Sequence, residues 1–476
     1  MGAQTIARRF FKTMYYLQNR WKLSRGRLTY YGVRGGDKLN KNVIKLNAKQ
    51  EKLLAALPCE LNARQLKILR AAVENRAIAE SLPAVTPKSL KEAQFCTNCS
   101  GNDFIIPGLE FNGDGLCALC ASAERTAKLK SVVPITDEIP RSKKSRFDVA
   151  VFYTGGKDST YLLYYLSVIK KLRVLALTWE IPYASDSALK SLENAKKMLD
   201  KVEFVTRSVC AEDMRTVYKR LYELSGNTCA CPSLAYVMFY PLLVEERVPY
   251  FIAGNEPAQL IGLFYNRMAP EIAYRFADSK PLNFLVNLGR ILTLRPPLKR
   301  GQFHTLTTMK QLAYGTNGFV KRSGYRNELV ENVTAAIHTV PHLVEPLKRS
   351  IKRSSFSGNI PAFVQIDFDK ISGGRYDWTK IKDEIAEKCG WVAPEDSGKG
   401  LHTSCKIERC KEYSQFVRFY NMQSTVIPFS ALEISLASRN GNITREQAVY
   451  EIENTMGFSL DEIAECKIMR EFFEKL

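Results

Sequence analysis

The chain has 476 residues, which is too long for one small core and predicts two to four domains. Lys and Arg outnumber Asp and Glu by 69 to 49, and this surplus indicates an anionic partner. No apolar run approaches the roughly 18 residues that a bilayer span needs, which argues against a spanning helix. The chain has 12 cysteines but no secretory apolar segment, so we expect metal-binding or catalytic thiols in the cytoplasm rather than disulfides.

Composition and periodicity divide the chain into segments. The first, a polar segment with apolar residues spaced three and four apart, predicts a helical N-terminal extension that includes a basic, aromatic leader helix. A cysteine-rich unit, an α/β segment, a basic helical region and a C-terminal α/β region that completes the active site follow. The expected boundaries are 1–95, 96–125, 147–260, 261–360 and 361–476.

The cysteine-rich unit reads "CTNCSGNDFIIPGLEFNGDGLCALC". Cys96 and Cys99 form one CxxC pair, and Cys117 and Cys120 form a second pair after seventeen intervening residues. Two such pairs predict a closed, tetrahedral four-thiolate zinc ribbon, in which the zinc is structural. An iron–sulfur cluster in the same ligand set and four unrelated cysteines are the alternatives.

From residue 147, apolar β-branched runs alternate with helical patterns. The runs are "DVAVFY", "RVLALTWE", "VEFVTR" and "VPYFIAG". Strands that alternate with helices predict a parallel, doubly wound sheet with helices on both faces, which places the chain in the α/β class.

The first of these strands runs into "TGGKDS" and then into a helix. Gly155 and Gly156 would leave backbone N–H groups of a helix N-terminus open to a phosphate. Lys157 would add a mobile positive charge, and Ser159 and Thr160 would add hydroxyl donors. The Walker A pattern requires Lys followed by Ser or Thr and does not fit. A chance glycine turn before a core helix is the alternative.

"TGGKDS" resembles the SGGxDS loop of the PP-loop ATP pyrophosphatases, the adenine nucleotide α-hydrolase-like superfamily. The resemblance implies a HUP-type sheet and an enzyme that binds ATP with Mg²⁺ and cuts it between the α and β phosphates. The first serine of the pattern is Thr154 here, which keeps a hydroxyl. Asp158 and Ser159 match the pattern, and with Lys157 they are the expected catalytic residues of the loop.

Open α/β sheets bind ligands at the carboxyl ends of their strands. Thr178 and Trp179 end the second strand and are candidates for the adenine pocket, although Trp179 could simply be buried between sheet and helix. Gly254, Asn255 and Glu256 follow a later strand and are expected to line the same crevice.

Further cysteines lie in two less regular groups. Cys229 and Cys231 precede a helix, whose dipole would favour a thiolate. Cys405 lies in "GLHTSCKIERCKEY" with His402 and Cys410. We expect Cys410 and Cys210 to be buried and inert.

In order, these pieces resemble the N-acetyl sugar amidotransferase family of surface-polysaccharide biosynthesis over residues 96–455. The matching stretches are "FNGDGLCALC", "TGGKDS", "CPSLAYVMFYPLLVEERVPYFIAGNEP", "YDWTKIKDEIAEKCGW", "HTSCKIERCKEYSQFVRFY" and "NGNITREQAVYEIE". By position, Cys231 and Cys405 correspond to the two recurrent non-zinc cysteines of that family. The N-terminal extension, "AGNEP", the extra Cys229 and "HTSC" depart from its pattern.

The resemblance implies adenylation of an amide or carboxylate oxygen and replacement of AMP by ammonia from a separate glutaminase. The alternative is a sulfurtransferase that uses a sulfur donor, with Cys229, Cys231 and Cys405 carrying persulfide or holding a [4Fe–4S] cluster. The anionic acceptor would be a nucleotide sugar, an acidic carrier protein or tRNA. Twelve Lys or Arg against three Glu between residues 290 and 353 suit the last two, and a solvated basic face is the other interpretation. A non-catalytic, zinc-containing nucleic-acid binder is a third hypothesis.

Overall fold

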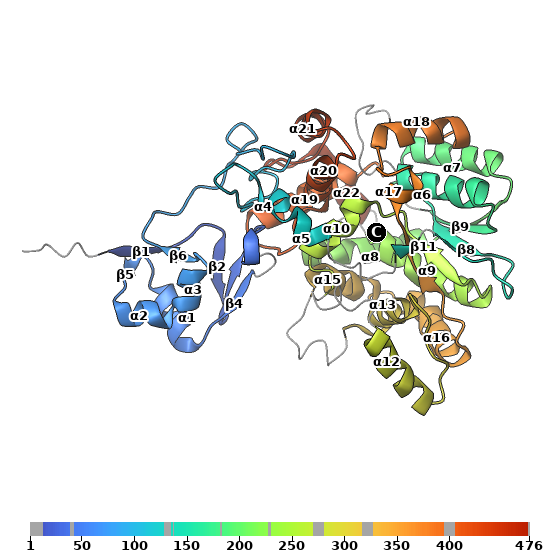
Figure 1. Ribbon diagram of the computed structural model, residues 1–476, viewed down its shortest axis with the longest axis horizontal. Helices are drawn as coiled ribbons and strands as arrows, with labels where there is room; N and C mark the ends of the chain where they lie inside the picture. The colour runs from blue at the N-terminus through green and yellow to red at the C-terminus, as the bar shows by residue number, and fades with distance from the viewer. Residues whose placement is uncertain are drawn as a thin grey trace, which may run out of the picture.

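The computed structural model describes residues 13–38, 42–127, 135–136, 138–180, 183–226, 230–269, 280–316, 327–394 and 405–474. The N-terminal strands lie at one end of the molecule and the parallel sheet lies near the other (Figure 1). Cys229 and His402 lie outside the described residues.

The central sheet has five parallel strands in the order β10-β9-β8-β11-β12. In that order they span Val202–Arg207, Val174–Trp179, Val149–Phe152, Tyr250–Ile252 and Ala362–Phe363. The α/β class with a parallel sheet is therefore confirmed. From β8 the chain continues to β9 and β10 on one side, and later adds β11 and β12 on the other side. The loops after β8 and β11 therefore meet at the point where ligands bind in open α/β sheets.

Helices cover both faces of this sheet. Val149 and Val151 of β8 belong to the same buried cluster as residues of α6, α7 and α18, whereas Ala150 and Phe152 pack with α9 on the opposite face. The first face carries α6 (Lys157–Tyr164), its π-helical continuation Tyr165–Ile169, α7 (Asp186–Met198) and α18 (Trp378–Cys389). The second layer consists of α8 (Ala211–Ser225), α9 (Cys231–Glu245), α13 (Gln302–Tyr314), α15 (Glu328–Ile337) and α16 (Pro341–Ser357).

The prediction that residues 1–95 form a helical extension is wrong for much of the part that the structure describes. Short strands form two three-stranded sheets, β5-β1-β6 and β2-β3-β4. The strands are β1 (Met14–Leu17), β2 (Trp21–Ser24), β3 (Arg27–Tyr30), β4 (Val43–Lys45), β5 (Cys59–Glu60) and β6 (Ile78–Ala79). Helices are confined to a 3₁₀ turn (Gly36–Lys38), α1 (Ala48–Ala55), α2 (Ala63–Ile68) and α3 (Arg70–Glu74).

The physical reason is a tight hairpin between β2 and β3. Arg25 and Gly26 form its two-residue turn, and both have positive φ, at 43° and 71°. Such turns match the twist of paired strands, and this one places Trp21 and Leu28 in a small core of their own. The aromatic leader helix is therefore not formed by the described residues of this segment.

The remaining elements join the cysteine-rich unit to the C-terminal helices. They are α4 (Ala118–Ala121), α5 (Ala123–Ala127), β7 (Ile135–Thr136), α10 (Pro257–Tyr265), α12 (Lys280–Leu292), β13 (Gln365–Ile366), α17 (Phe368–Ile371), α19 (Glu408–Tyr420), α20 (Phe429–Asn440), α21 (Arg445–Asn454) and α22 (Ala464–Glu474). Strand β13 pairs in parallel with β7. Within the described ranges, no helix combines the length and the apolarity that crossing a bilayer requires.

Candidate active site

The glycine loop occupies the carboxyl end of β8, as the sequence predicts. Gly155 has φ +75°, and a Cβ there would lie 2.3 Å from the carbonyl oxygen of Ala188. Gly156 is the N-cap of α6 and supplies no side chain to cap the helix. The first N–H groups of a helix have no partner within that helix, so this turn offers backbone donors to an anion.

The hydroxyl groups of the loop point inward. Ser159 and Thr160 both donate to the carbonyl oxygen of Gly156, at 3.1 and 2.8 Å. A phosphate would gain these donors only if the side chains rotated, so the backbone N–H groups are the donors in place. Thr154 is half-buried directly after the strand.

Lys157 is not the mobile charge that the sequence suggested. Its side chain is 3% exposed, and its ammonium group contacts the carboxylate of Asp158. The same group lies 4.8 Å from the ring centroids of Tyr376 and Trp378. A buried ammonium needs such partners, because an unpaired charge is costly to desolvate.

Asp158 receives a second partner from the C-terminal region. The hydroxyl of Tyr376 donates to Asp158 Oδ1 at 2.6 Å. Burial, and next the charge of Asp158, raise the pKa of Tyr376 well above its usual value, so the phenol stays protonated. The carboxylate is thus held in one orientation at the start of α6.

The loop after β11 packs directly against α6. A Cβ on Gly254 would lie 2.9 Å from the backbone nitrogen of Ser159, so only glycine permits this approach. Asn255 accepts from Gln365 Nε2 at 3.1 Å and donates to Gln259 at 3.2 Å. Gln259 then donates to Glu433 of α20 at 2.8 Å. A chain of three side-chain amides therefore connects the carboxyl edge of the sheet with α20.

Glu256 is fully buried beside this chain. One carboxyl oxygen accepts from the indole of Trp378 at 3.2 Å, and the other has no hydrogen-bond partner among the described residues. Burial raises the pKa of Glu256 well above its usual value, and the charge of Glu433 raises it further. Burial therefore favours the protonated form of this carboxyl group in the interior of the site.

Thr178 and Trp179 end β9, next to the loop strand. Within the described part of the chain, neither Thr178 Oγ1 nor Trp179 Nε1 has a hydrogen-bond partner, although both atoms are buried. Buried polar atoms without partners are candidates for ligand contact. The Trp179 ring also packs edge-on against Phe152 at 6.0 Å, so it contributes to the core as well.

Several residues at this site were not singled out from the sequence. Tyr376, Trp378 and Trp391 all lie in the "YDWTKIKDEIAEKCGW" stretch, and Trp391 Nε1 donates to the carbonyl oxygen of Gly155 at 3.2 Å. The tryptophans at both ends of that stretch were the available signal. Glu433 was detectable as a charge inside the otherwise apolar pattern "PFSALEISLAS".

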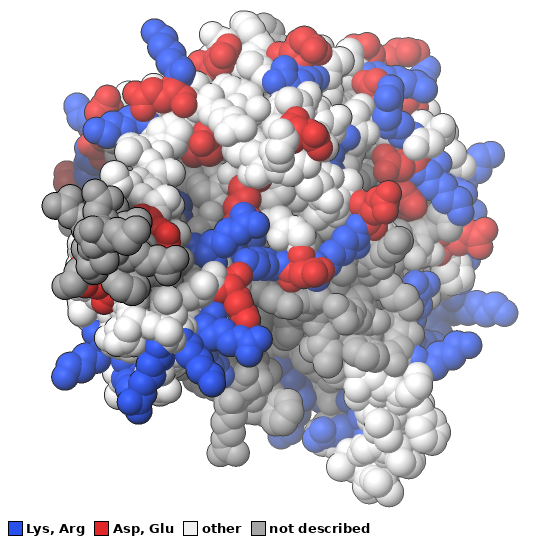
Figure 2. All heavy atoms as spheres, turned by 60° about the vertical axis from the view of Figure 1, so that its left-hand side comes forward, with Lys and Arg blue, Asp and Glu red and all other residues white. Residues whose placement is uncertain are grey.

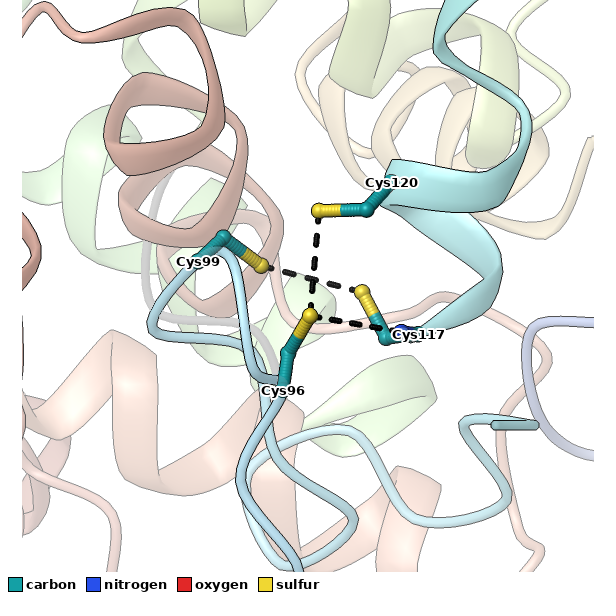
Figure 3. Close-up of side chains that lie close together, drawn as sticks. All are labelled: Cys96, Cys99, Cys117 and Cys120. Carbon is teal, nitrogen blue, oxygen red and sulfur yellow. Dashed lines mark hydrogen bonds between the residues drawn. The ribbon is translucent and has the colours of Figure 1, made fainter. Parts of the chain in front are cut away.

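The four cysteines of the two CxxC pairs converge on one centre (Figure 3). The Sγ–Sγ distances are 3.8 Å for Cys96 and Cys120 and 3.7 Å for Cys99 and Cys117. Four thiolates about 2.3 Å from a tetrahedral zinc ion are about 3.8 Å apart, so the set fits one zinc ion. In a [4Fe–4S] cluster each thiolate would bind a different iron, and the sulfurs would be farther apart.

Backbone donors surround these sulfurs. The N–H groups of Asn98 and Cys117 point to Cys96 Sγ at 3.4 and 3.3 Å, and the N–H of Gly101 points to Cys99 Sγ at 3.3 Å. Such bonds stabilise thiolates. Arg445 of α21 donates to the carbonyl oxygens of Cys96 and Cys99, so the cysteine unit is fastened to the C-terminal helices.

The other cysteines fall in different environments. Cys231 begins α9, and its Sγ lies 2.7 Å from the hydroxyl of Tyr218. Cys405 forms a β-bridge with Ala184, and both Cys231 and Cys405 pack against the same apolar cluster. Cys410 is buried as expected, with its sulfur 2.8 Å from that of Cys466.

Cys210 corrects one expectation. It is exposed at the N-cap of α8 rather than buried, because the cap position lies outside the apolar face of that helix.

Comparisons with known proteins give little further identification. No family model matches the chain, and no curated protein matches it. One solved structure that matches is the U34-tRNA thiolase NcsA from Methanococcus maripaludis with its [4Fe–4S] cluster, at 17% identity and a TM-score of 0.23. The match covers 56% of this chain and 88% of that chain. A likeness at this level does not confirm the resemblance to N-acetyl sugar amidotransferases.

Proposed function

We propose that the chain is an ATP-dependent transferase that adenylates its substrate and releases pyrophosphate. The observation that carries this proposal is the double-glycine turn at the switch point of the parallel sheet. Gly155 and Gly156 leave the N-terminus of α6 open, and Asp158 is fixed beside it by Tyr376. This arrangement suits the binding of a polyphosphate.

In the proposed first step, an amide or carboxylate oxygen of the substrate attacks the α-phosphate of ATP. The new bond is oxygen to α-phosphorus, the broken bond joins the α-phosphate to the β-phosphate, and pyrophosphate departs with its electron pair. The N–H groups at the start of α6 would stabilise the pyrophosphate. Asp158 is the loop carboxylate that would share Mg²⁺ with phosphate oxygens, and the bound ion would neutralise the developing charge.

In the second step a nucleophile displaces AMP. By resemblance to the N-acetyl sugar amidotransferases, we propose ammonia as the nucleophile, supplied by a separate glutaminase, and a nucleotide sugar or another anionic acceptor. Nitrogen would replace oxygen at the activated carbon, and AMP would leave with that oxygen.

A sulfur nucleophile is the second candidate, favoured by the placement of two cysteines. Cys231 and Cys405 belong to different segments and yet pack against one cluster, and Cys405 bridges to the segment that leads into α7. A persulfide loaded on one thiol by a sulfur donor would attack the activated carbon through its terminal sulfur and displace AMP, which gives a disulfide-linked adduct. Attack of the other cysteine thiolate on that disulfide would release the thioamide or thiolated base, on a carrier-bound substrate or tRNA, and an external thiol would reduce the disulfide left between the two cysteines. With Cys229 they would supply three thiolates for a [4Fe–4S] cluster.

Product analysis tests the adenylation. Purified protein with ATP, Mg²⁺ and a cell extract as the source of acceptor is expected to form AMP and pyrophosphate, and Asp158→Ala or Ser159→Ala is expected to abolish both. Release of ADP and phosphate, or unchanged AMP release by both variants, would refute the loop assignment.

The nucleophile is tested separately. Small molecules that accumulate when the gene is deleted identify the acceptor by mass spectrometry. Incubation of that acceptor with ammonium or with sulfide then distinguishes the two candidates by product mass. Visible sulfide-to-iron absorbance of the anaerobically purified protein would support the sulfur branch.

A further inference from the structure

Helix α12 (Lys280–Leu292) has its polar side toward the protein. Arg290 is buried, and its guanidinium donates to the carbonyl oxygens of Pro296 and Ser355 at 2.8 and 3.0 Å. Asn287, one turn earlier, makes hydrogen bonds of 3.1 and 2.7 Å with the backbone of Leu298. Specific polar contacts therefore fix the orientation of α12 on the body of the molecule.

The opposite side of α12 is apolar and exposed. The exposed fractions of its large apolar side chains and of one just beyond it run from 41% to 90%, for Leu282, Phe284, Leu285, Leu288, Ile291, Leu292 and Leu294. An amphipathic helix in a globular protein normally buries this stripe, so its exposure marks a contact surface. Figure 1 shows α12 projecting from the body below α13.

The surroundings of this apolar side are positively charged. The described residues 280–316 include six Lys or Arg and no Asp or Glu. At the nearby end of α16, Lys352 and Arg353 are exposed, and the guanidinium of Arg295 lies 5.2 Å from the ring centroid of the exposed Phe356. Figure 2 is the view of Figure 1 turned about the vertical axis, so each element keeps its height. The lowest lobe in Figure 2, at the height of α12 in Figure 1, is largely white and has Lys and Arg near it.

We propose that α12 is an interfacial helix that docks the protein on an anionic membrane surface. Its apolar side would enter the boundary between headgroups and acyl chains, while Lys and Arg contact the anionic headgroups. A 13-residue helix is too short to span a bilayer, so it would lie in the plane of the surface. Pairing of two copies through this face would bring like charges together, which disfavours a dimer as the occupant.

Vesicle flotation with the full chain tests this surface. We expect the protein to float with vesicles of phosphatidylcholine and phosphatidylglycerol, less with phosphatidylcholine alone, and less again as salt is raised. The triple variant Phe284→Ser, Leu285→Ser, Leu288→Ser is expected to lower the partition coefficient at least roughly tenfold. The matched control is Leu82→Ser with Val85→Ser, which removes two apolar side chains that are 73% and 82% exposed elsewhere. The control is expected to float like the unmodified protein.

Other outcomes overturn the proposal. Failure of the unmodified protein to float with either vesicle, or equal flotation of the triple variant, would exclude a membrane role for α12. A dimer in sedimentation that the triple variant dissociates, without flotation, would assign the face to a second copy. Circular dichroism and AMP formation, expected to be unchanged in the triple variant, show that it is folded.

Discussion

The hydroxyl of Tyr376 donates a 2.6 Å hydrogen bond to Asp158, although 218 residues separate them in the chain. Tyr376 precedes α18, which packs on α6 and α7. The loop carboxylate is therefore oriented by a residue that lies outside the strands of the central sheet. Residues beyond the sheet are part of the site because they fix the loop.

Replacing Tyr376 with phenylalanine tests this positioning. Tyr376→Phe removes only the hydroxyl, and a hydrogen bond to a charged group contributes about 1.5–3 kcal/mol to the free energy of unfolding. We expect a loss of about that size in urea unfolding and a roughly tenfold lower kcat for AMP formation, with a smaller change in KM.

The matched control is Tyr420→Phe, whose hydroxyl donates to the carbonyl oxygen of Pro87 far from the loop. It is expected to change stability without changing kcat. Equal loss of kcat in both variants would mean that Tyr376 acts only through stability.

Gly155→Ala addresses the turn itself. A Cβ at residue 155 would lie 2.3 Å from the carbonyl oxygen of Ala188, and φ is +75°. Both features force the loop to move, so we expect loss of ATP binding in calorimetry and a lower melting temperature. Gly113→Ala is the control, because nothing lies within 4 Å of its added Cβ. If Gly155→Ala bound ATP normally, the turn would not be the nucleotide site.

The four-cysteine unit is expected to hold one zinc ion per chain. Cys96→Ser, or removal of the metal by a chelator, should lower the melting temperature because Arg445 joins this unit to α21. Cys59→Ser, in β5 outside the unit, is expected to leave the metal content unchanged. Metal analysis measures the zinc content, and thermal unfolding measures the melting temperature. A folded protein without bound metal would contradict the prediction.

The sequence predicts the sheet and the loop because their signals are local. A β-branched run, two glycines and a helix lie within twenty residues, and the spacing of two CxxC pairs defines the cysteine unit from a single stretch. Gly254 lies beside Ser159 at the start of α6, because the carboxyl ends of parallel strands share one edge.

The features of the site that the sequence did not predict depend on contacts between distant segments. The inward direction of Lys157 follows from Tyr376 and Trp378, whose position no local pattern specifies. The prediction of a helical N-terminal extension failed for a local reason. Arg25 and Gly26 form a turn with positive φ, but the helix-like spacing of apolar residues in the segment obscured this signal. In that segment the turn residues, rather than the apolar periodicity, determine the secondary structure of the first strands.

Cys231→Ser and Cys405→Ser separate the two steps of the proposed reaction. Neither residue belongs to the loop after β8, so pyrophosphate release in the first turnover is expected to continue, whereas AMP release and transfer to the acceptor are expected to stop. Single-turnover assays of pyrophosphate, which reports the first step, and of AMP and product mass, which report the second step, distinguish the steps. Cys210→Ser, at an exposed helix cap, is the control. Normal product formation by both variants would remove the cysteines from the transfer step.

Glu256 predicts a pH dependence of stability. Its pKa is raised well above 4.5 in the folded protein by burial, so the folded state keeps a proton that the unfolded chain loses above that pH. The stability contribution of Glu256 is therefore complete below about pH 4.5 and decreases as pH rises toward the folded pKa, by at most about 1.4 kcal/mol per pH unit. Glu256→Gln cannot titrate, so its free energy of unfolding should rise relative to the unmodified protein between pH 5 and neutrality in urea titrations. Glu193→Gln, at an exposed position of α7, should show no such trend. Parallel pH profiles for Glu256→Gln and the unmodified protein would show that Glu256 is ionised in the fold.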